Sequence, residues 1–146
     1  MRTQIKLEKQ YILINTSQDD ISRACFISYN SRGFGSSKQE FCKFLLSDSF
    51  SGDKTPILCN QEHFIMKGNC YKIMQALTGF HLIIKPAVKV SHENGRAKNG
   101  MFIAVPDKIK NQITDVSPSS WRVQAAILKC KKSKLFIINS YFPVDK

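Results

Sequence analysis

The stretch Pro56–Phe64, PILCNQEHF, joins a short apolar run to three polar residues. The apolar run, Ile57–Cys59, follows the turn-like Gly52–Pro56 and predicts a buried strand of a parallel or mixed sheet. Ligands of open α/β sheets bind just beyond the carboxyl ends of the strands. We therefore expect Glu62 to face a cleft, where a carboxylate suits a hard cation such as Mg²⁺. Taken alone, a solvated strand end explains Glu62 at least as well.

The composition is that of one globular domain with a strong positive charge. The chain has 146 residues, of which 42% are hydrophobic and 10% aromatic. This is enough for a single domain with its own core. Lys and Arg number 22 against 11 Asp and Glu, which gives a formal net charge of +11. Such an excess favours a polyanionic partner, with nucleic acid (DNA) ahead of an anionic membrane surface.

The cysteines indicate a reducing compartment. There are five of them, without a Cys-x-x-Cys pair and mostly inside apolar runs. This favours buried, reduced thiols in a nuclear or cytoplasmic protein. Cys59, His63 and Cys70 lack a fourth ligand at a recognised zinc spacing. No apolar run is long enough to span a bilayer, and charged residues interrupt the N-terminal stretch where a signal peptide needs its apolar core. We expect an intracellular protein that does not associate with a membrane.

Apolar runs bounded by turns predict a mixed α/β layer. The expected strands are Tyr11–Ile14, Arg23–Asn30, Ile57–Cys59, Phe80–Lys85, Gly100–Val105, Arg122–Leu128 and Leu135–Tyr141. The last two bracket a lysine-rich turn at 129–134, as antiparallel neighbours would. Those lysines could contact phosphate or simply be solvated.

Helices are expected between the strands. Ser37–Glu40 has the spacing of a capping box, and Phe41, Phe44 and Leu45 then share one helical face. A weaker helix covers Lys67–Leu77, with Asn69 as a possible cap. Its predicted apolar side comprises Tyr71, Met74 and Leu77. A short helix is expected near 107–111.

Two loops were considered for ligand binding. Residues 86–99 form a polar, basic loop that is long for a connection without structure of its own, and such loops are often functional. It contains His92, Glu93, Arg96 and Lys98. The glycines of Ser31–Gly35 are turn glycines, because no Gly-Lys-Ser/Thr follows them and a P-loop is thereby excluded.

Four segments, in this order and spacing, resemble the endonuclease/exonuclease/phosphatase superfamily. They are Ser28–Phe34 (SYNSRGF), Ile57–His63 (ILCNQEH), Asn99–Val105 (NGMFIAV) and Ile137–Pro143 (IINSYFP). The resemblance is greatest to the endonuclease domains of LINE-type (non-LTR) retrotransposons and to craniofacial-development-protein-2-like sequences. It implies an N-terminal extension at 1–22 and a partial domain at 23–146. The implied fold is the N-terminal half of a four-layer α/β sandwich, a mixed sheet with flanking helices.

The resemblance also implies a catalytic set. Glu62 is expected to bind the metal, Mg²⁺, while Asn30 orients the metal site and the scissile phosphate. Tyr141 is expected to contact that phosphate. The set makes physical sense, because phosphodiester hydrolysis needs a cation on the non-bridging oxygens and donors that hold the phosphate in line with the attacking water.

Three further residues are expected to position the substrate, namely Gln61, Arg122 and Arg96. Arg122 resembles the family's arginine that braces the acidic cluster. The family often carries an acidic residue at or near the preceding position, where this chain has Trp121. This departure places the bracing network in question.

Several later motifs of the family have no counterpart in this chain. Only FPVDK follows Tyr141, whereas the family continues with a Gly-Asp-Phe-Asn-like segment, a further aspartate and a Ser-Asp-His. The resemblance thus implies one metal-side carboxylate without the general base or the imidazole. We expect a weak or incomplete Mg²⁺ site and little or no activity of the chain alone. We also expect an exposed apolar sheet face that a partner chain or a second copy would cover.

Three functions remain open at this point. The first is a partial Mg²⁺-dependent phosphodiesterase domain, a DNA endonuclease of the retroelement type. The second is a non-catalytic nucleic-acid-binding module that uses the loop 86–99 and the lysines of 129–134. The third is a lipid or inositol phosphoesterase of the same superfamily. The charge excess modestly favours nucleic acid.

Overall fold

The computed structural model describes residues 8–15, 21–89, 97–130 and 132–142. Its helices are α1 (Ser36–Leu45), α2 (Asp48–Ser51) and α3 (Tyr71–Ala76), with 3-10 helices η1 (Lys67–Asn69) and η2 (Asp107–Gln112). Its strands are β1 (Glu8–Asn15), β2 (Ile21–Asn30), β3 (Thr55–Gln61), β4 (Phe80–Lys85), β5 (Val88–Lys89), β6 (Ala97–Lys98), β7 (Met101–Pro106), β8 (Ile113–Asp115), β9 (Val123–Lys129) and β10 (Lys134–Ser140). Arg96, His92 and Glu93 lie outside the described residues.

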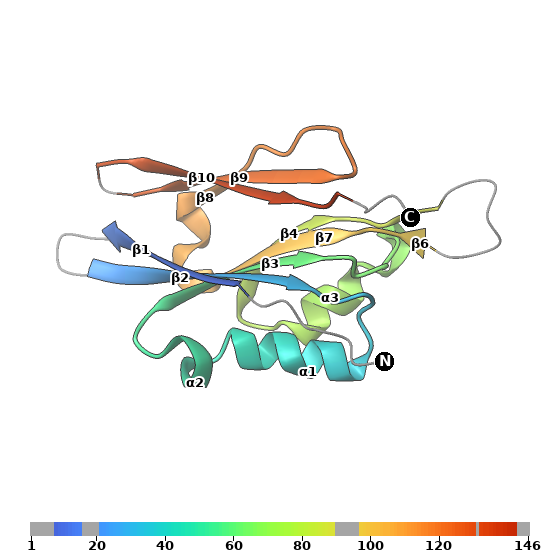
Figure 1. Ribbon diagram of the computed structural model, residues 1–146, viewed down its shortest axis with the longest axis horizontal. Coiled ribbons are helices and arrows are strands. Elements are labelled where there is room, and N and C mark those ends of the chain that lie inside the picture. The colour runs from blue at the N-terminus through green and yellow to red at the C-terminus, as the bar shows by residue number, and fades with distance from the viewer. Residues whose placement is uncertain (1–7, 16–20, 90–96, 131, 143–146) are drawn as a thin grey trace.

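Two sheets and a set of helices form the layers of the molecule. The larger sheet has five strands in the order β1-β2-β3-β7-β4. It is mixed, because β2 and β3 are parallel while β3 and β7 are antiparallel. Helices α1, α2 and α3 cover one of its faces, and the three-stranded sheet β10-β9-β8 lies over the other (Figure 1). An α/β fold with a mixed sheet and flanking helices, as predicted, is confirmed.

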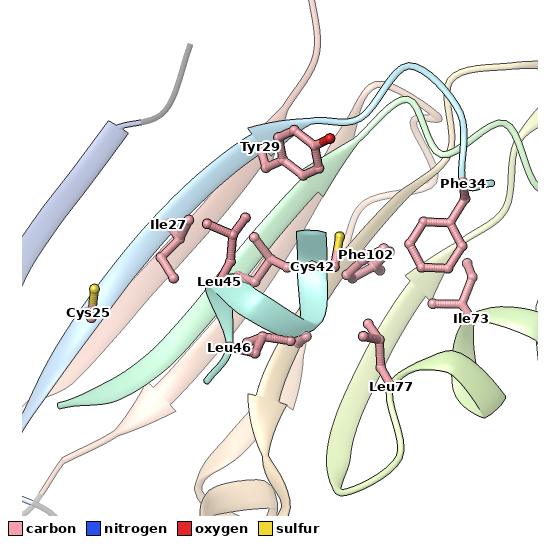
Figure 2. Close-up of a cluster of buried hydrophobic side chains, with 12 residues drawn as sticks. Cys25, Ile27, Tyr29, Phe34, Cys42, Leu45, Leu46, Ile73, Leu77 and Phe102 are labelled. Atoms are coloured by element: carbon pink, nitrogen blue, oxygen red, sulfur yellow. The ribbon is translucent and has the colours of Figure 1, made fainter. Parts of the chain in front are cut away.

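Strand β3 is buried along almost all of its length, and its apolar run Ile57–Cys59 packs on both faces of the sheet. Leu58 packs with the helices in a cluster that includes Tyr29, Leu45 and Phe102 (Figure 2). Ile57 points the other way and packs in the cluster beneath β9 and β10. The predicted short run therefore forms the centre of two cores, one on each side of the sheet.

The capping box predicted for α1 is not formed. Ser36 is already helical and Gly35 is the N-cap, without a side-chain hydrogen bond. Ser37 thus lies inside the first turn, where its hydroxyl cannot occupy the capping position. Cys42 and Leu45 form the buried side, whereas Phe44 is 49% exposed.

The predicted face of the second helix was right at Leu77 and wrong at Tyr71 and Met74. Tyr71 and Met74 are 51% and 60% exposed, while Ile73 and Leu77 are buried. Ile73 and Leu77 are four residues apart and share one side of the turn, so Ile73 packs beside Leu77 in place of Tyr71 and Met74. The helix begins after Cys70, not at Asn69.

Several connections differ from the expectation. The loop 86–99 has structure of its own, because β5 and β6 pair within it. Strand β1 falls in the predicted N-terminal extension and pairs antiparallel with β2, while the domain boundary itself stays a prediction. Strand β8 and helix α2 were not expected.

Within the described ranges, no helix combines the length and the apolar character that a membrane crossing requires.

Exposed apolar side chains lie on the smaller sheet. The β9–β10 hairpin covers part of the larger sheet through buried Ala126, Leu128 and Ile137. On the opposite side of β10, Phe136 and Ile138 are 66% and 69% exposed. Alternation along a strand sends successive side chains to opposite faces. Phe136 and Ile138 therefore form an apolar patch on the outer face of the smaller sheet, while the exposed inner face expected on the larger sheet stays a prediction.

Candidate functional site

The carboxyl ends of β2, β3 and β10 lie at the same end of the molecule (Figure 1). Asn30 and Gln61 are paired residues of the parallel strands β2 and β3. Beyond them, Ser31 N–H donates to Gln61 O at 3.0 Å and Gly33 N–H donates to Glu62 O at 2.7 Å. The two strand ends are thereby joined, and this fixes Asn30 beside Glu62.

Unusual backbone conformations cluster around this end. Arg32, Glu62, Phe64 and Asn99 have φ angles of 48°, 57°, 60° and 66°, and they are the non-glycine residues with positive φ in the part of the chain that the structure describes. Phe64 N–H donates to Asn99 O at 2.9 Å, which ties two of them together. Residues held in sparsely populated conformations often occur at functional sites.

Asn30, Glu62 and Tyr141 lie close together, while their catalytic roles stay predictions. The Asn30 side-chain Nδ2–H donates to Glu62 Oε1 at 2.8 Å, and its Oδ1 accepts from Arg32 N–H at 3.2 Å. Burial raises the pKa of Tyr141, and the neighbouring Glu62 carboxylate raises it further, whereas the charges of Arg32 and Arg122 lower it. A carboxylate, an amide and a phenol thus lie together, and the charges of two guanidinium groups act on the phenol.

Gln61 is buried and points between the two sheets. Its Nε2 donates to Asn139 Oδ1 at 2.6 Å and to the backbone oxygen of Cys59 at 3.1 Å. Asn139 in turn lies one residue before Ser140, where β10 ends. Gln61 therefore sets the position of β10, and through it that of Tyr141. A direct contact of Gln61 with a substrate stays a prediction.

Arg122 stacks on an aromatic ring instead of bracing a carboxylate. Its Cζ lies 4.6 Å from the centre of the Trp121 ring. Across the described ranges, no ion pair of Arg122 with an acidic residue is formed. Its backbone oxygen accepts from Tyr141 N–H at 3.0 Å, which keeps it beside the site. The third predicted positioning residue, Arg96, lies outside the described residues.

His63 supports the loop that carries Glu62. Its Nδ1 accepts from Ile65 N–H at 2.9 Å, so Nε2 carries the proton and donates to Lys85 O at 3.2 Å. Burial lowers its pKa to about 4, and the hydrogen bond to Lys85 opposes this only in part. His63 is therefore a neutral, structural imidazole. None of the five cysteines forms a disulfide, and Cys25 and Cys42 are buried.

A basic groove of about 830 Å³ begins at the site. Its lining includes Arg32, Lys72 and Lys98, together with Phe64 and Met66. Phe64 and Met66 are 39% and 41% exposed. Cationic side chains interleaved with exposed apolar ones suit a strand of nucleic acid, because the cations meet phosphates and the apolar groups meet bases or sugars.

The donor set fits Mg²⁺ only in part. Within the described ranges, no three His, Cys, Asp or Glu side chains are grouped so that they could hold a metal. Glu62 supplies one carboxylate, with one oxygen engaged by Asn30. Mg²⁺ is commonly held by one or two carboxylates together with water and substrate phosphates. Glu62 can therefore serve as a single protein ligand of a weak site that a phosphate would complete.

The sequence analysis missed several of these residues. Arg32 falls in the turn Ser31–Gly35 and Lys72 in the expected helix Lys67–Leu77, and neither was singled out for binding. Asn139 had a detectable signal, because it continues the inward-facing alternation of Leu135 and Ile137 with a polar side chain. An amide at such a position predicts a buried hydrogen-bond partner.

The α/β fold, with its mixed sheet and flanking helices, has a counterpart among solved structures. A matching solved structure is the AP endonuclease LMAP from Leishmania major, with a TM-score of 0.56 and 15% sequence identity. The match covers 80% of this chain and 39% of that chain. At this identity the likeness concerns the fold, and the relation to LINE-type domains stays a prediction. Searches found no matching family model and no matching curated protein.

Proposed function

We propose that this chain is a partial, metal-dependent phosphodiesterase domain of the nuclease type that acts on DNA, with a retroelement endonuclease as its closest functional parallel. The observation that carries the proposal is the meeting of Glu62, Asn30 and Tyr141 with two arginines at the carboxyl ends of β2, β3 and β10. The nuclease-like fold supports the same proposal.

Each residue has a distinct task in this proposal. Glu62 would hold Mg²⁺, which neutralises the non-bridging oxygens of the phosphate when it is bound. Asn30 fixes the Glu62 carboxylate through its hydrogen bond to Oε1. Tyr141 keeps its proton at neutral pH because its pKa is raised, so its hydroxyl can donate to a phosphate oxygen. Arg32 and Arg122 add the positive charge that attracts the substrate.

The chain alone should have little or no activity. A single carboxylate leaves the attacking water without a general base, which normally contributes about 100- to 10,000-fold to the rate. The match to 39% of the nuclease structure supports the view that this chain corresponds to part of a larger catalytic unit. The proposal therefore concerns substrate binding and one half of the metal site.

The first test is plasmid nicking with and without Mg²⁺, on the wild type and on Glu62→Gln. We expect no nicking above background from either protein. Nicking that requires both Mg²⁺ and Glu62 would show that the chain, or a dimer of it, is competent alone. It would overturn the inactivity while upholding the phosphodiesterase assignment.

A second measurement tests the half-site without catalysis. Mg²⁺ should strengthen DNA binding by the wild type, because the cation joins the Glu62 carboxylate to a phosphate. Glu62→Gln should remove this dependence, and Glu40→Gln should leave it intact, since Glu40 is an exposed residue of α1 paired with Lys43. Equal effects of Mg²⁺ on all three proteins would contradict the metal role of Glu62.

The basic groove favours a second candidate, a nucleic-acid-binding module without chemistry. Each lost phosphate contact should reduce the slope of log K against log salt by about 0.7 for a single strand. Lys72→Ala should do so, whereas Lys108→Ala, at an exposed position on η2, should not. Salt-dependent binding without any influence of Mg²⁺ or Glu62 would select this candidate. Stronger binding to inositol phosphates than to DNA would instead select a lipid or inositol phosphoesterase relative.

A further inference from the structure

The segment between β8 and β9 presents two planar side chains beside the candidate site. It ends in Trp121 and Arg122, directly before β9. The guanidinium carbon of Arg122 lies 4.6 Å from the centre of the Trp121 ring. Arg122 is exposed and Trp121 is half-buried. The indole thus supports a guanidinium that remains accessible to solvent.

This segment is held by a lysine that donates hydrogen bonds to several backbone carbonyls. The ammonium of Lys85 donates to the backbone oxygens of Pro118 at 2.6 Å, Ser120 at 2.5 Å and Val123 at 2.8 Å. These bonds join the end of β4 to both sides of the Trp121–Arg122 pair. Hydrogen bonds from a charged donor are stronger than those between neutral groups, so the segment is fixed without a ligand.

A second side chain fixes the pair itself. Asn99, which is buried, donates from Nδ2 to the backbone oxygen of Trp121. The next carbonyl, that of Arg122, accepts from Tyr141 N–H at 3.0 Å. The pair therefore has a defined position relative to Tyr141. The charge of Arg122 also acts on Tyr141, because it lowers the pKa of the Tyr141 phenol.

We propose that the Arg122 guanidinium, supported by the Trp121 ring, is a stacking surface for a nucleobase of single-stranded nucleic acid, next to the phosphate held at Tyr141 and Arg32. The inference rests on the proposed nucleic-acid binding and adds how a base is recognised. Bases stack on aromatic rings and on guanidinium planes irrespective of their sequence. A lysine at position 122 would keep the charge and lose the plane.

The test uses the fact that Trp121 is the only tryptophan of the chain. Its fluorescence is followed during titration with a single-stranded DNA ten-mer and with an abasic ten-mer that has the same number of phosphates. We expect the base-containing strand to bind about tenfold more tightly, in line with one stacked base, and to quench the fluorescence. The abasic strand should bind through its phosphates with little quenching.

Variants separate stacking from charge. Arg122→Lys should bind both strands with nearly equal affinity while keeping the salt dependence of the wild type, because the charge remains. Trp121→Phe should preserve part of the preference for bases, and Trp121→Leu should lose it; both are followed by the anisotropy of a labelled strand. Arg32→Gln, which removes the positive charge and with it a phosphate contact, should weaken both strands alike.

The outcomes are distinguishable. Equal affinity of the wild type for both strands, with salt-dependent binding, would overturn the stacking surface and leave the proposed nucleic-acid binding intact. No binding of either strand would overturn the proposed function and this inference with it. A preference for bases that survives in both Arg122→Lys and Trp121→Leu would place the stacking elsewhere and contradict the assignment.

Discussion

His63 connects separate segments of the chain through one neutral ring. It accepts a hydrogen bond from Ile65 N–H and donates one to Lys85 O. Its ring also lies against Gly100, where an added Cβ would be 2.4 Å from the His63 Cε1 atom. Gly100 therefore has two reasons to be glycine, the close ring and a φ of +84°. Protonation of Nδ1 would remove the acceptor that Ile65 uses.

The pH dependence of stability follows from this ring. Its pKa is lowered from 6.5 to about 4, so the unfolded chain takes up the proton first as the pH falls. The contribution of His63 is complete above pH 6.5 and declines between pH 6.5 and 4. We expect about 2 kcal/mol of unfolding free energy to be lost at pH 5 relative to pH 8, measured by urea unfolding.

Two histidine variants isolate the effect. His63→Gln should be less stable than the wild type at pH 8, yet show a flatter dependence between pH 6.5 and 5. His81→Gln, on the edge strand β4, should retain the wild-type dependence. Parallel pH profiles of the wild type and His63→Gln would refute the role of this imidazole.

The positions of residues at strand ends were predictable from the sequence, whereas the contacts that hold these strand ends in place were not. Asn30 and Glu62 follow apolar runs that pair as parallel strands, so their proximity follows from chain order. The function of His63 depends on Lys85, at the end of β4, and on Gly100, directly before β7. No local pattern reports such a contact, and the zinc spacing that was considered for His63 concerns a different chemistry.

At the scale of elements, a chain of amides joins four strands. Gln124 Nε2 donates to Ile83 O at 2.7 Å, and Asn139 Nδ2 donates to Gln124 Oε1 at 3.2 Å. The chain ends with the bond from Gln61 to Asn139. It runs from β4 through β9 and β10 to β3, and all three amide side chains are buried. Buried polar networks of this kind specify how elements align.

Asn139→Leu should disrupt this alignment. The leucine is similar in size, but it leaves the Gln61 donor and the Gln124 acceptor without their partner, at a cost of about 2–4 kcal/mol in unfolding free energy. Thermal and urea unfolding measure the loss. Lys134→Leu, at an exposed position of the same strand, is the matched control. Equal stabilities of the two variants would show that the amide chain contributes little.

Local patterning determined which elements could be predicted. The β9–β10 hairpin was expected because two alternating runs flank a short turn, and the strands are paired antiparallel as predicted. The buried side of α3 was not, because a six-residue helix presents too few positions for a periodicity to be read. Strand β8 has three residues, which carry no recognisable signal of their own.

At the scale of the whole molecule, the smaller sheet has one covered and one uncovered face. Phe136 and Ile138 project from the uncovered face of β10, where their paired neighbours are Ile127 and Ala125. Contiguous exposed apolar side chains mark interaction surfaces or aggregation. A partner chain or second copy on this face stays a prediction.

Replacing both residues should reduce the tendency of the protein to associate. The double variant Phe136→Thr, Ile138→Thr places β-branched threonines, which suit a strand, at both exposed positions, so the unfolding free energy should change by no more than about 1 kcal/mol. Binding of a hydrophobic dye and concentration-dependent association, followed by light scattering, should both decrease. Val116→Thr, which changes an apolar residue that is 43% exposed, is the control. Unchanged dye binding in the double variant would locate the apolar surface elsewhere.

The class of fold could be predicted because strands and helices alternate along the first half of the chain. The packing of the two sheets could not, since it depends on side chains far apart in sequence. The site was partly predictable, because its strand-end residues follow from local patterns, whereas the places of Arg32, Trp121 and the groove depend on tertiary structure.

The amide chain also bears on the time course of folding. Gln61 and Asn139 are 78 positions apart, and contacts between distant segments form late because the loop between them must first be closed. The β1–β2 and β9–β10 hairpins, by contrast, join neighbours in sequence and can form early. Tyr141 should therefore reach Glu62 only in a final docking step, so the phosphate site is among the last parts of the molecule to mature and among the first to come apart.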